Sequence, residues 1–329
     1  MTEPDPAAHG TPLVGHRAPA DTPAPRSTVV VLAGGTGGAK LARGMLDVVG
    51  PGELVVIANT GDDIDIYGAH VSPDPDLVSF WLADLIDERG WGIRDDTFEV
   101  MDALRALGSG VWFNLGDRDL AWCLERKRME SEGLRPTEAL RALNESIGVG
   151  ARVLPMSDDP VRTWVRTTVG WRSFQEFMIR LRAEGAIEGL EFRGAEEATP
   201  SPEALSALES ARAIVIGPSN PLASIAPILA VPGIREALAE TSAPVVAVSP
   251  IVGGEVLKGP TASFMAFAAL HLGASGVADF YGELLDGLVA DEPLPGELSV
   301  LHIDTRMDDA LARARVAEQT LTFALSLTG

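Results

Sequence analysis

Five aspartates lie between Asp62 and Asp76, in a segment otherwise rich in turn-forming residues. Carboxylate oxygens are hard ligands, and Mg²⁺ held by one or two of them commonly bridges the phosphates of a substrate. Aspartate also begins helices and stabilises turns, so helix caps and Asx turns are the simpler alternative. We expect a divalent metal to be bound by at least one of four acids, namely Asp62, Asp63, Asp74 and Asp76.

A glycine-rich turn at residues 33–40, Ala-Gly-Gly-Thr-Gly-Gly-Ala-Lys, indicates a second kind of chemistry. It follows a β-branched apolar run and precedes a helical pattern over 39–49. Such a turn presents free backbone N–H groups and the positive end of a helix dipole to an anion. We therefore predict a phosphate site formed by Gly35, Thr36, Gly37, Gly38 and Lys40; a turn that only packs helix on strand is the alternative.

The spacing of this turn departs from both common phosphate-binding motifs. The dinucleotide pattern G-x-G-x-x-G, begun at Gly35, requires glycine or alanine where Lys40 stands. The P-loop pattern requires glycine before that lysine and serine or threonine after it, and the chain has Ala39 and Leu41. A nicotinamide-dependent dehydrogenase is therefore disfavoured.

Parallel strands joined by helices are expected to position these residues. The alternation of apolar runs and helical spacing is typical of an α/β fold with a doubly wound, mostly parallel, Rossmann-like sheet. We predict strands over 29–33, 54–58, 111–115, 151–155, 213–216, 244–248 and 298–303, and helices over 39–49, 77–89, 96–107, 137–147 and 308–327. Ligands of such sheets bind outside the carboxyl ends of the strands, so the glycine-rich turn and the acids should face one crevice.

Three more polar turns follow predicted strands. Gly217-Pro218-Ser219-Asn220 and Ser249-Pro250-Ile251 offer hydroxyls, an amide and free N–H groups, which suit a base, a ribose or a phosphate. Asp117-Arg118-Asp119 follows the strand expected at 111–115, and both an internal ion pair and ligand contact remain open there.

The chain divides unevenly. Residues 1–27 contain six prolines and no apolar block, so they lack the core of a signal peptide and cannot bury enough surface to fold. We interpret them as a disordered Pro/Ala-rich extension to a domain over 28–329. Within that domain, a less regular part at about 160–212 is expected to form a smaller, subsidiary α+β lobe.

The composition of the chain restricts the cellular compartment and the classes of binding partner that we expect. A net charge of −21 argues against nucleic-acid binding, which depends on basic residues that neutralise phosphates. No apolar run approaches the roughly 18 to 20 residues of a membrane span. The single cysteine, Cys123, cannot form an internal disulfide, which fits a reducing compartment. We expect a cytoplasmic protein without membrane partners.

Eight short motifs, taken together, resemble those of one family. Besides the glycine-rich turn they are Asn-Thr-Gly-Asp-Asp, Ser-Pro-Asp-Pro-Asp, Trp-Gly-Ile-Arg-Asp-Asp-Thr-Phe, Leu-Gly-Asp-Arg-Asp, Leu-Pro-Met-Ser-Asp-Asp-Pro, Ile-Gly-Pro-Ser-Asn-Pro and Val-Ser-Pro-Ile. Each is short, but their order and spacing from residue 29 onward are specific. The chain resembles the CofD/FbiA family, the 2-phospho-L-lactate or phosphoenolpyruvate transferases of deazaflavin coenzyme (factor 420) biosynthesis.

The resemblance implies a Mg²⁺-dependent transfer reaction and a homodimer. The donor would be a guanosine diphosphate with enolpyruvoyl or lactoyl on its terminal phosphate. The acceptor would be the ribityl hydroxyl of the hydroxy-deazariboflavin Fo, and GMP would leave. By position, Asp62 and Asp74 match metal-binding acids of the family, and Asp76 and Asn114 match its deazaflavin contacts. The guanosine diphosphate would be held by residues of two turns: Gly217, Pro218, Ser219, Asn220, Ser249, Pro250 and Ile251.

Several alternatives remain open. Asp62, Asp63 and Asp76 are all candidates for a catalytic base, and a bound metal could make a dedicated base unnecessary. Lactate, enolpyruvate and glycerate donors differ by one small substituent that the sequence does not distinguish. Some members of the family have lysine where this chain has Asn114, and the proline-rich extension is atypical. A related family of non-enzymatic regulators of gluconeogenesis, which bind sugar nucleotides, shares the fold and the glycine-rich opening.

Overall fold

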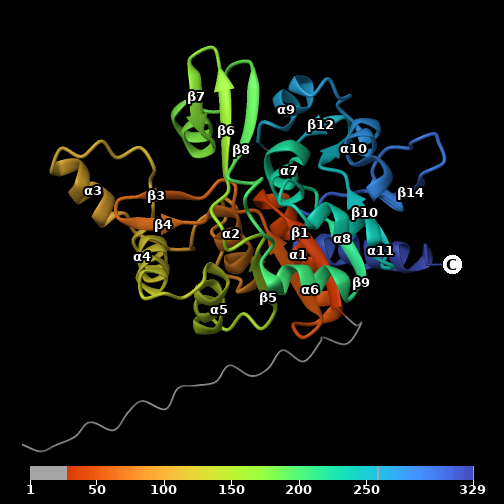
Figure 1. The fold of residues 1–329 in the computed structure, drawn as a ribbon, viewed down its shortest axis with the longest axis horizontal. Helices are drawn as coiled ribbons and strands as arrows, with labels where there is room; N and C mark the ends of the chain where they lie inside the picture. The colour runs from red at the N-terminus through yellow and green to blue at the C-terminus, as the bar shows by residue number, and fades with distance from the viewer. Residues whose placement is uncertain (1–27, 258, 329) are drawn as a thin grey trace, which may run out of the picture.

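The computed structural model of the protein describes residues 28–257 and 259–328, so the predicted N-terminal extension lies outside the described residues. Its centre is a seven-stranded sheet of order β14-β13-β10-β9-β1-β2-β5, in which all neighbouring strands run parallel. The strands are β1 (Thr28–Ala33), β2 (Leu54–Ala58), β5 (Arg152–Pro155), β9 (Ala211–Ile216), β10 (Val245–Val248), β13 (Gly287–Ala290) and β14 (Ser299–His302). The predicted α/β fold with a doubly wound parallel sheet is confirmed (Figure 1).

The order of the strands reverses between β1 and β9. The chain adds β2 and β5 on one side of β1, then returns to place β9, β10, β13 and β14 on the other side. Val31 of β1 therefore pairs with Val56 of β2 and with Val215 of β9. Open α/β sheets bind ligands outside the carboxyl ends of their strands at such a switch point. The turns after β1 and β9 are thus the first place to look for a site.

Helices cover both faces of the sheet, which explains why β1 is a continuous apolar run rather than an alternating one. All six residues of β1 are buried. Val29 and Val31 pack into one hydrophobic core, and Val30 and Leu32 pack into the other. The first core is completed by α1 (Gly35–Val49), α2 (Pro73–Leu82), α4 (Asp117–Ser131), α5 (Pro136–Ser146) and α11 (Ala310–Ser326). The second is completed by α6 (Pro202–Glu209), α7 (Ala226–Leu229), α8 (Ile234–Glu240), α9 (Thr261–Phe267) and α10 (Ala274–Tyr281).

The C-terminal helix α11 packs beside α1 (Figure 1). A Cβ atom on Gly44 of α1 would lie 2.3 Å from the carbonyl oxygen of Arg313 in α11. Glycine at this position therefore allows the two helices to approach closely. The contact holds the start of α11 near the helix that carries the glycine-rich turn.

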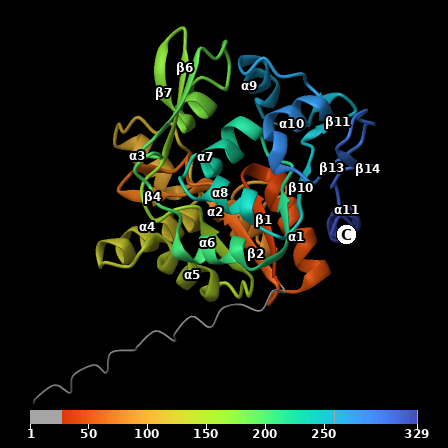
Figure 2. The same ribbon diagram turned by 45° about the vertical axis from the view of Figure 1, so that its right-hand side comes forward.

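Smaller elements project from the large sheet. The antiparallel strands β6 (Arg162–Thr167), β7 (Gly170–Ser173) and β8 (Gly189–Arg193) form a three-stranded sheet, seen at the top of Figures 1 and 2. The π-helix η1 (Glu176–Arg180) follows β7. Helix α6 contacts β1, β5 and β9 of the large sheet, although it belongs to the same stretch 160–212. The separation of that stretch as a lobe stays a prediction.

Two hairpins and three short helices complete the described chain. The hairpins are β3 (Ile64–Ile66) with β4 (Ala69–Val71), and β11 (Ile251–Val252) with β12 (Glu255–Val256). The helices are α3 (Glu99–Ala106), the π-helix η2 (Pro221–Ile225) and the 3₁₀ helix η3 (Gly282–Leu284). Among the described residues, no single helix has the length and apolarity to cross a bilayer, although one bent pair, Pro221–Leu229 with Ile234–Glu240, qualifies by length and composition alone.

Local structure differs from the prediction in several places. The strand predicted at 111–115 is wrong, because that segment is irregular and leads into α4, a helix that the sequence analysis missed. The helix predicted at 77–89 is instead α2, which begins at Pro73; proline suits the first helical position, where the N–H has no helical partner. Helix α1 begins at Gly35, so the glycine-rich turn is its first turn. Strand β13 was not predicted either.

Candidate active site

A cavity of about 880 Å³ opens at the carboxyl ends of the central strands. Most residues predicted to bind nucleotide or metal line it, as does Asn114: Gly35, Thr36, Gly37, Lys40, Asp62, Asp74, Pro218, Ser219, Asn220, Ser249 and Pro250. Five other predicted site residues are described by the structure but do not line the cavity: Gly38, Asp63, Asp76, Gly217 and Ile251. The structure therefore brings together turns that are far apart in the sequence, but it does not bring every predicted residue to the same surface.

The first turn of α1 packs directly on the turn after β9. The backbone N–H of Gly34 donates to Oγ of Ser219 at 3.2 Å. A Cβ on Gly37 would lie 2.0 Å from the carbonyl oxygen of Pro218, and a Cβ on Gly38 would lie 2.7 Å from Oγ of Ser219. These two glycines thus let helix and turn meet. Gly35, with a φ of +64°, has only Oγ of Ser224 near its missing Cβ, at 3.9 Å.

Asp74 is in the first turn of α2 and lies against the N-terminus of α1, where it accepts a hydrogen bond from the backbone N–H of Gly35 at 2.6 Å. The amide nitrogen of Asn59, which follows β2, donates to Asp74 at 2.9 Å and to Asp62 at 3.2 Å. The other oxygen of Asp62 accepts from Nε2 of Gln175 at 3.1 Å. Two cavity-lining carboxyls are therefore bridged by one neutral amide.

This acid pair carries an electrostatic penalty. Both side chains belong to residues that are 5% exposed. Burial, followed by the charges of Asp74 and Asp63, raises the pKa of Asp62 well above its ordinary value. Burial also raises the pKa of Asp74 to about 6, while the hydrogen bonds from Asn59 and Gly35 act in the opposite direction. A divalent cation between these carboxyls would remove the penalty, so the donor set fits Mg²⁺.

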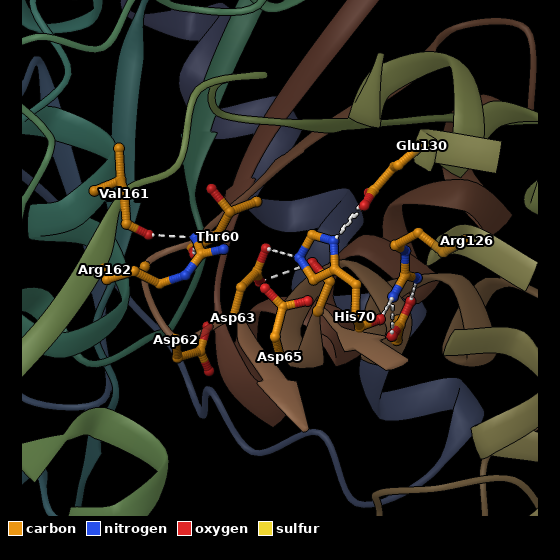
Figure 3. Close-up of polar contacts among 12 residues, drawn as sticks. Thr60, Asp62, Asp63, Asp65, His70, Arg126, Glu130, Val161 and Arg162 are labelled. Atoms are coloured by element: carbon orange, nitrogen blue, oxygen red, sulfur yellow. Dashed lines mark hydrogen bonds and ion pairs between the residues drawn. The ribbon is translucent and has the colours of Figure 1, made fainter. Parts of the chain in front are cut away.

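Asp63 belongs to a different network, although it is adjacent to Asp62 (Figure 3). Oγ of Ser72 donates to Asp63 at 2.8 Å, and Nε2 of His70 lies 3.2 Å from its second oxygen. Nδ1 of His70 lies 2.8 Å from Glu130 of α4. Burial alone would lower the pKa of His70, but its hydrogen bonds with Asp63 and Glu130 raise it to about 9. Both oxygens of Asp63 are thus engaged away from the cavity.

Asp76 is held even more firmly. Its oxygens accept hydrogen bonds from both terminal nitrogens of Arg126 and from Nε1 of Trp122, the latter at 2.7 Å. Asp76 is 4% exposed and Arg126 is 3% exposed, so this is a buried ion pair between α2 and α4. The sequence analysis missed Arg126, because the helix that carries it was not predicted.

An aromatic wall forms another part of the cavity. It is contributed by the segment before α4 and by the segment around η1: Trp91, Phe98, Trp112, Phe113 and Phe174. Asn114 lies in this wall, and its Oδ1 accepts a hydrogen bond from Nη2 of Arg105 at 2.6 Å. Flat apolar side chains with a few polar groups suit a planar ring system.

Reciprocal helix caps position this wall. Asp96 accepts hydrogen bonds from the backbone N–H groups of Arg118 and Asp119 in the first turn of α4, at 2.9 and 3.0 Å. Asp117 in turn accepts from the first two N–H groups of α3, at 3.0 Å each. A Cβ on Gly116 would lie 2.1 Å from the Asp96 carboxylate. Asp117 therefore has a capping role, and the Asp-Arg-Asp turn opens α4 rather than following a strand.

Comparison with known proteins gives matches over most of the chain. Residues 29–315 match the family model described as 2-phospho-L-lactate transferase CofD. The chain is 40% identical over 265 residues to a 2-phospho-L-lactate transferase of Methanosarcina mazei, covering 80% of this chain and 87% of that protein. It is 42% identical over 311 residues to a phosphoenolpyruvate transferase of Streptomyces griseus, covering 90% of this chain and 98% of that protein.

Solved structures support the fold. A crystal structure of a Bacillus halodurans protein aligns with a TM-score of 0.53 at 20% identity, covering 88% of this chain and 90% of that chain. A second crystal structure of the same Bacillus halodurans protein, described there as a member of the UPF0052 family, aligns with a TM-score of 0.53 at 18% identity and covers 82% of each chain. At such identities the likeness concerns the fold alone. The family match over residues 29–315 and the relatives at about 40% identity show that this chain belongs to the CofD family of 2-phospho-L-lactate transferases.

Proposed function

We propose that the protein transfers a phosphoenolpyruvyl or 2-phospho-L-lactyl group from a guanosine diphosphate-linked donor to the hydroxy-deazariboflavin Fo. The ribityl hydroxyl oxygen of Fo bonds to the distal phosphorus of the donor. The bond between that phosphorus and the bridging oxygen breaks, and GMP leaves. Transfers of this kind require mainly positioning and neutralisation of charge.

One observation carries the proposal. A single cavity contains the predicted phosphate-binding surface at α1 and the aromatic wall, and the acids Asp62 and Asp74 lie between the two. Asp74 accepts a hydrogen bond from Gly35, in the turn predicted to bind phosphate. Asp62 accepts a hydrogen bond from Gln175, the residue that follows Phe174 of the aromatic wall. An acceptor ring on the wall and a diphosphate at α1 would therefore bring hydroxyl and phosphorus together beside the two acids.

The donor fits the side formed by α1 and the turns after β9 and β10. The N-terminus of α1 faces the cavity with Thr36 and Gly37, and Lys40 adds a positive charge to the same lining. Ser219 and Ser249 contribute hydroxyls next to these groups. This combination suits a diphosphate and the sugar attached to it.

Asp62 and Asp74 are the residues that would hold Mg²⁺. Among the described residues, the hydrogen bonds that these two side chains accept come from neutral donors, although the charge of Arg162 also acts to lower the pKa of Asp62. The cation would therefore add counter-charge that the hydrogen-bonded donors do not supply. Mg²⁺ bound there supplies neutralisation of the charge on the diphosphate and on the leaving GMP. Of the three candidate bases, only Asp62 is among the described residues of the cavity wall, and we assign acceptance of the hydroxyl proton to it.

We further propose that the enzyme acts in the cytoplasm as a homodimer, in line with the family resemblance. The buried free thiol of Cys123 suits a reducing compartment. Size-exclusion chromatography with light scattering would measure the mass of the assembly directly. A monomeric mass at micromolar concentration would contradict the dimer.

The test of the function is turnover of Fo with Mg²⁺ and three guanosine donors, carrying phosphoenolpyruvate, phospholactate or phosphoglycerate. Mass spectrometry would identify the product. We expect a product from at least one donor, and its mass would name the three-carbon acid. No product from any donor, together with no binding of Fo, would contradict the proposal and favour a sugar-nucleotide-binding regulator.

A further inference from the structure

Asp119 is an acid of the cavity wall to which no role has been assigned above. It lies in the first turn of α4 and lines the cavity. Within the described part of the chain, its side chain has one polar partner, the thiol of Cys123 at 3.9 Å, and a thiol is a weak donor. The carboxyl therefore retains its capacity to accept a strong hydrogen bond from a molecule in the cavity.

Asp76 lies directly behind Asp119. Oxygens of the two carboxyls and the sulfur of Cys123 are within 4.8 Å of one another. Asp76 is saturated by Arg126 and Trp122, and it is not among the described residues of the cavity wall. Of these two neighbouring acids, Asp119 is thus the one that a ligand can reach.

In the protein without a bound ligand, the carboxyl of Asp119 lies in an environment that disfavours its charge. Burial and the neighbouring acids Asp76 and Asp96 raise its pKa to about 7, although the charge of Arg126 and the hydrogen bond from Cys123 act in the opposite direction. A partly buried carboxyl without a strong donor costs folding free energy. A donor on a bound ligand would offset that cost, as is common for groups that serve binding rather than stability.

Asn114 lines the same cavity and is oriented by its own partner. Arg105 occupies Oδ1 of Asn114, which leaves the amide N–H groups as donors. Trp112 and Phe113 belong to the same segment and add aromatic surface to the cavity wall. A donor and an acceptor beside aromatic rings match the edge of a planar heterocycle that carries a carbonyl next to an N–H.

We propose that Asp119 is a specificity-determining residue of the acceptor subsite, where its carboxyl accepts a hydrogen bond from the ring imide N–H of Fo while Asn114 donates to an adjacent ring carbonyl. This inference rests on the proposed function, since it takes Fo as the acceptor. It assigns to Asp119 the carboxyl contact with the deazaflavin that the family resemblance implies for Asp76.

The test compares Fo with Fo methylated at the ring imide nitrogen, in titrations that follow the fluorescence of the deazaflavin. Wild-type protein is expected to bind Fo about tenfold more tightly than the methylated ring, because methylation removes the hydrogen bond that the ring N–H donates to the Asp119 carboxyl. Asp119→Ala should bind Fo about tenfold more weakly and should no longer distinguish the two ligands. Glu125→Gln is the matched control, since it removes one exposed charge from the same helix.

Thermal unfolding of the same proteins separates binding from folding. Asp119→Ala should unfold at a temperature no lower than wild type, because the variant removes a carboxyl that has acidic neighbours. A preference for Fo that survives in Asp119→Ala, or a wild-type protein that binds both ligands equally, would overturn this inference and leave the transferase function intact. A wild-type protein that binds neither ligand would overturn both.

Discussion

The backbone N–H of Gly35 donates to Oδ1 of Asp74 at 2.6 Å and thereby joins the first turn of α1 to the first turn of α2. The positive end of the α1 dipole thus acts on a carboxylate of the acid pair. The same helix N-terminus lines the cavity beside that acid. A diphosphate and a metal ion bound here would share one surface, so the phosphate site and the acid pair form a single unit.

Asp74→Ala should lower turnover of Fo by about a hundredfold or more, because it removes half of the proposed metal site. The fold should persist, since the variant also removes the neighbouring charge that helps to raise the pKa of the buried Asp62. Steady-state kinetics with varied Mg²⁺, together with circular dichroism, would measure both effects. The control is Asp65→Ala, an exposed acid of the same stretch that pairs with Lys127. Full activity of Asp74→Ala would remove Asp74 from the metal site.

Asp76→Ala should destabilise the protein by about 3–5 kcal/mol, because it removes the carboxylate that pairs directly with the buried guanidinium of Arg126. Urea unfolding monitored by tryptophan fluorescence would give the free energy of unfolding. Asp65→Ala again serves as the comparison, since the loss of an exposed pair costs about 1 kcal/mol or less. Equal stabilities of the two variants would show that the buried pair contributes no more than a surface pair.

Gly37→Ala should weaken binding of guanosine diphosphate and lower stability by about 1–3 kcal/mol. The added Cβ would lie 2.0 Å from the backbone oxygen of Pro218, so helix α1 and the β9 turn must separate. Isothermal titration calorimetry with guanosine diphosphate would measure the affinity. Gly52→Ala is the control, because a Cβ there meets nothing within 4 Å. Unchanged affinity in Gly37→Ala would contradict the idea that this close contact shapes the phosphate site.

His70 should make stability depend on pH above neutrality. Its pKa is raised to about 9 in the folded protein by hydrogen bonds with Asp63 and Glu130 that outweigh burial. An unfolded histidine has a pKa of about 6.5, so the contribution is complete below that pH and is lost as pH rises through about 9. His70→Asn should therefore be less stable than wild type at pH 6, and the difference should shrink towards pH 10. Thermal unfolding across this range would measure it, and parallel profiles would contradict the assignment.

Local patterns in the sequence determined the sheet and the kind of chemistry at its edge. A strand buried on both faces of a parallel sheet must be apolar along its whole length, and runs such as Val29–Leu32 and Val245–Val248 are visible without a structure. Glycine-rich and hydroxyl-rich turns follow these runs directly. Because the carboxyl ends of parallel strands share one edge, the meeting of the β1 turn with Ser219 follows from the same pattern.

Only the tertiary structure decided which acids face the cavity. Asp62 and Asp63 are chemically equivalent neighbours, yet the first lines the cavity and contacts Asn59 and Gln175, whereas the second contacts His70 and Ser72. Asp76 finds its counter-charge in Arg126, at a sequence separation of 50 residues. Whether a carboxyl is paired, buried or left for a ligand depends on side chains brought close by folding, and residue spacing within one segment carries no information about them.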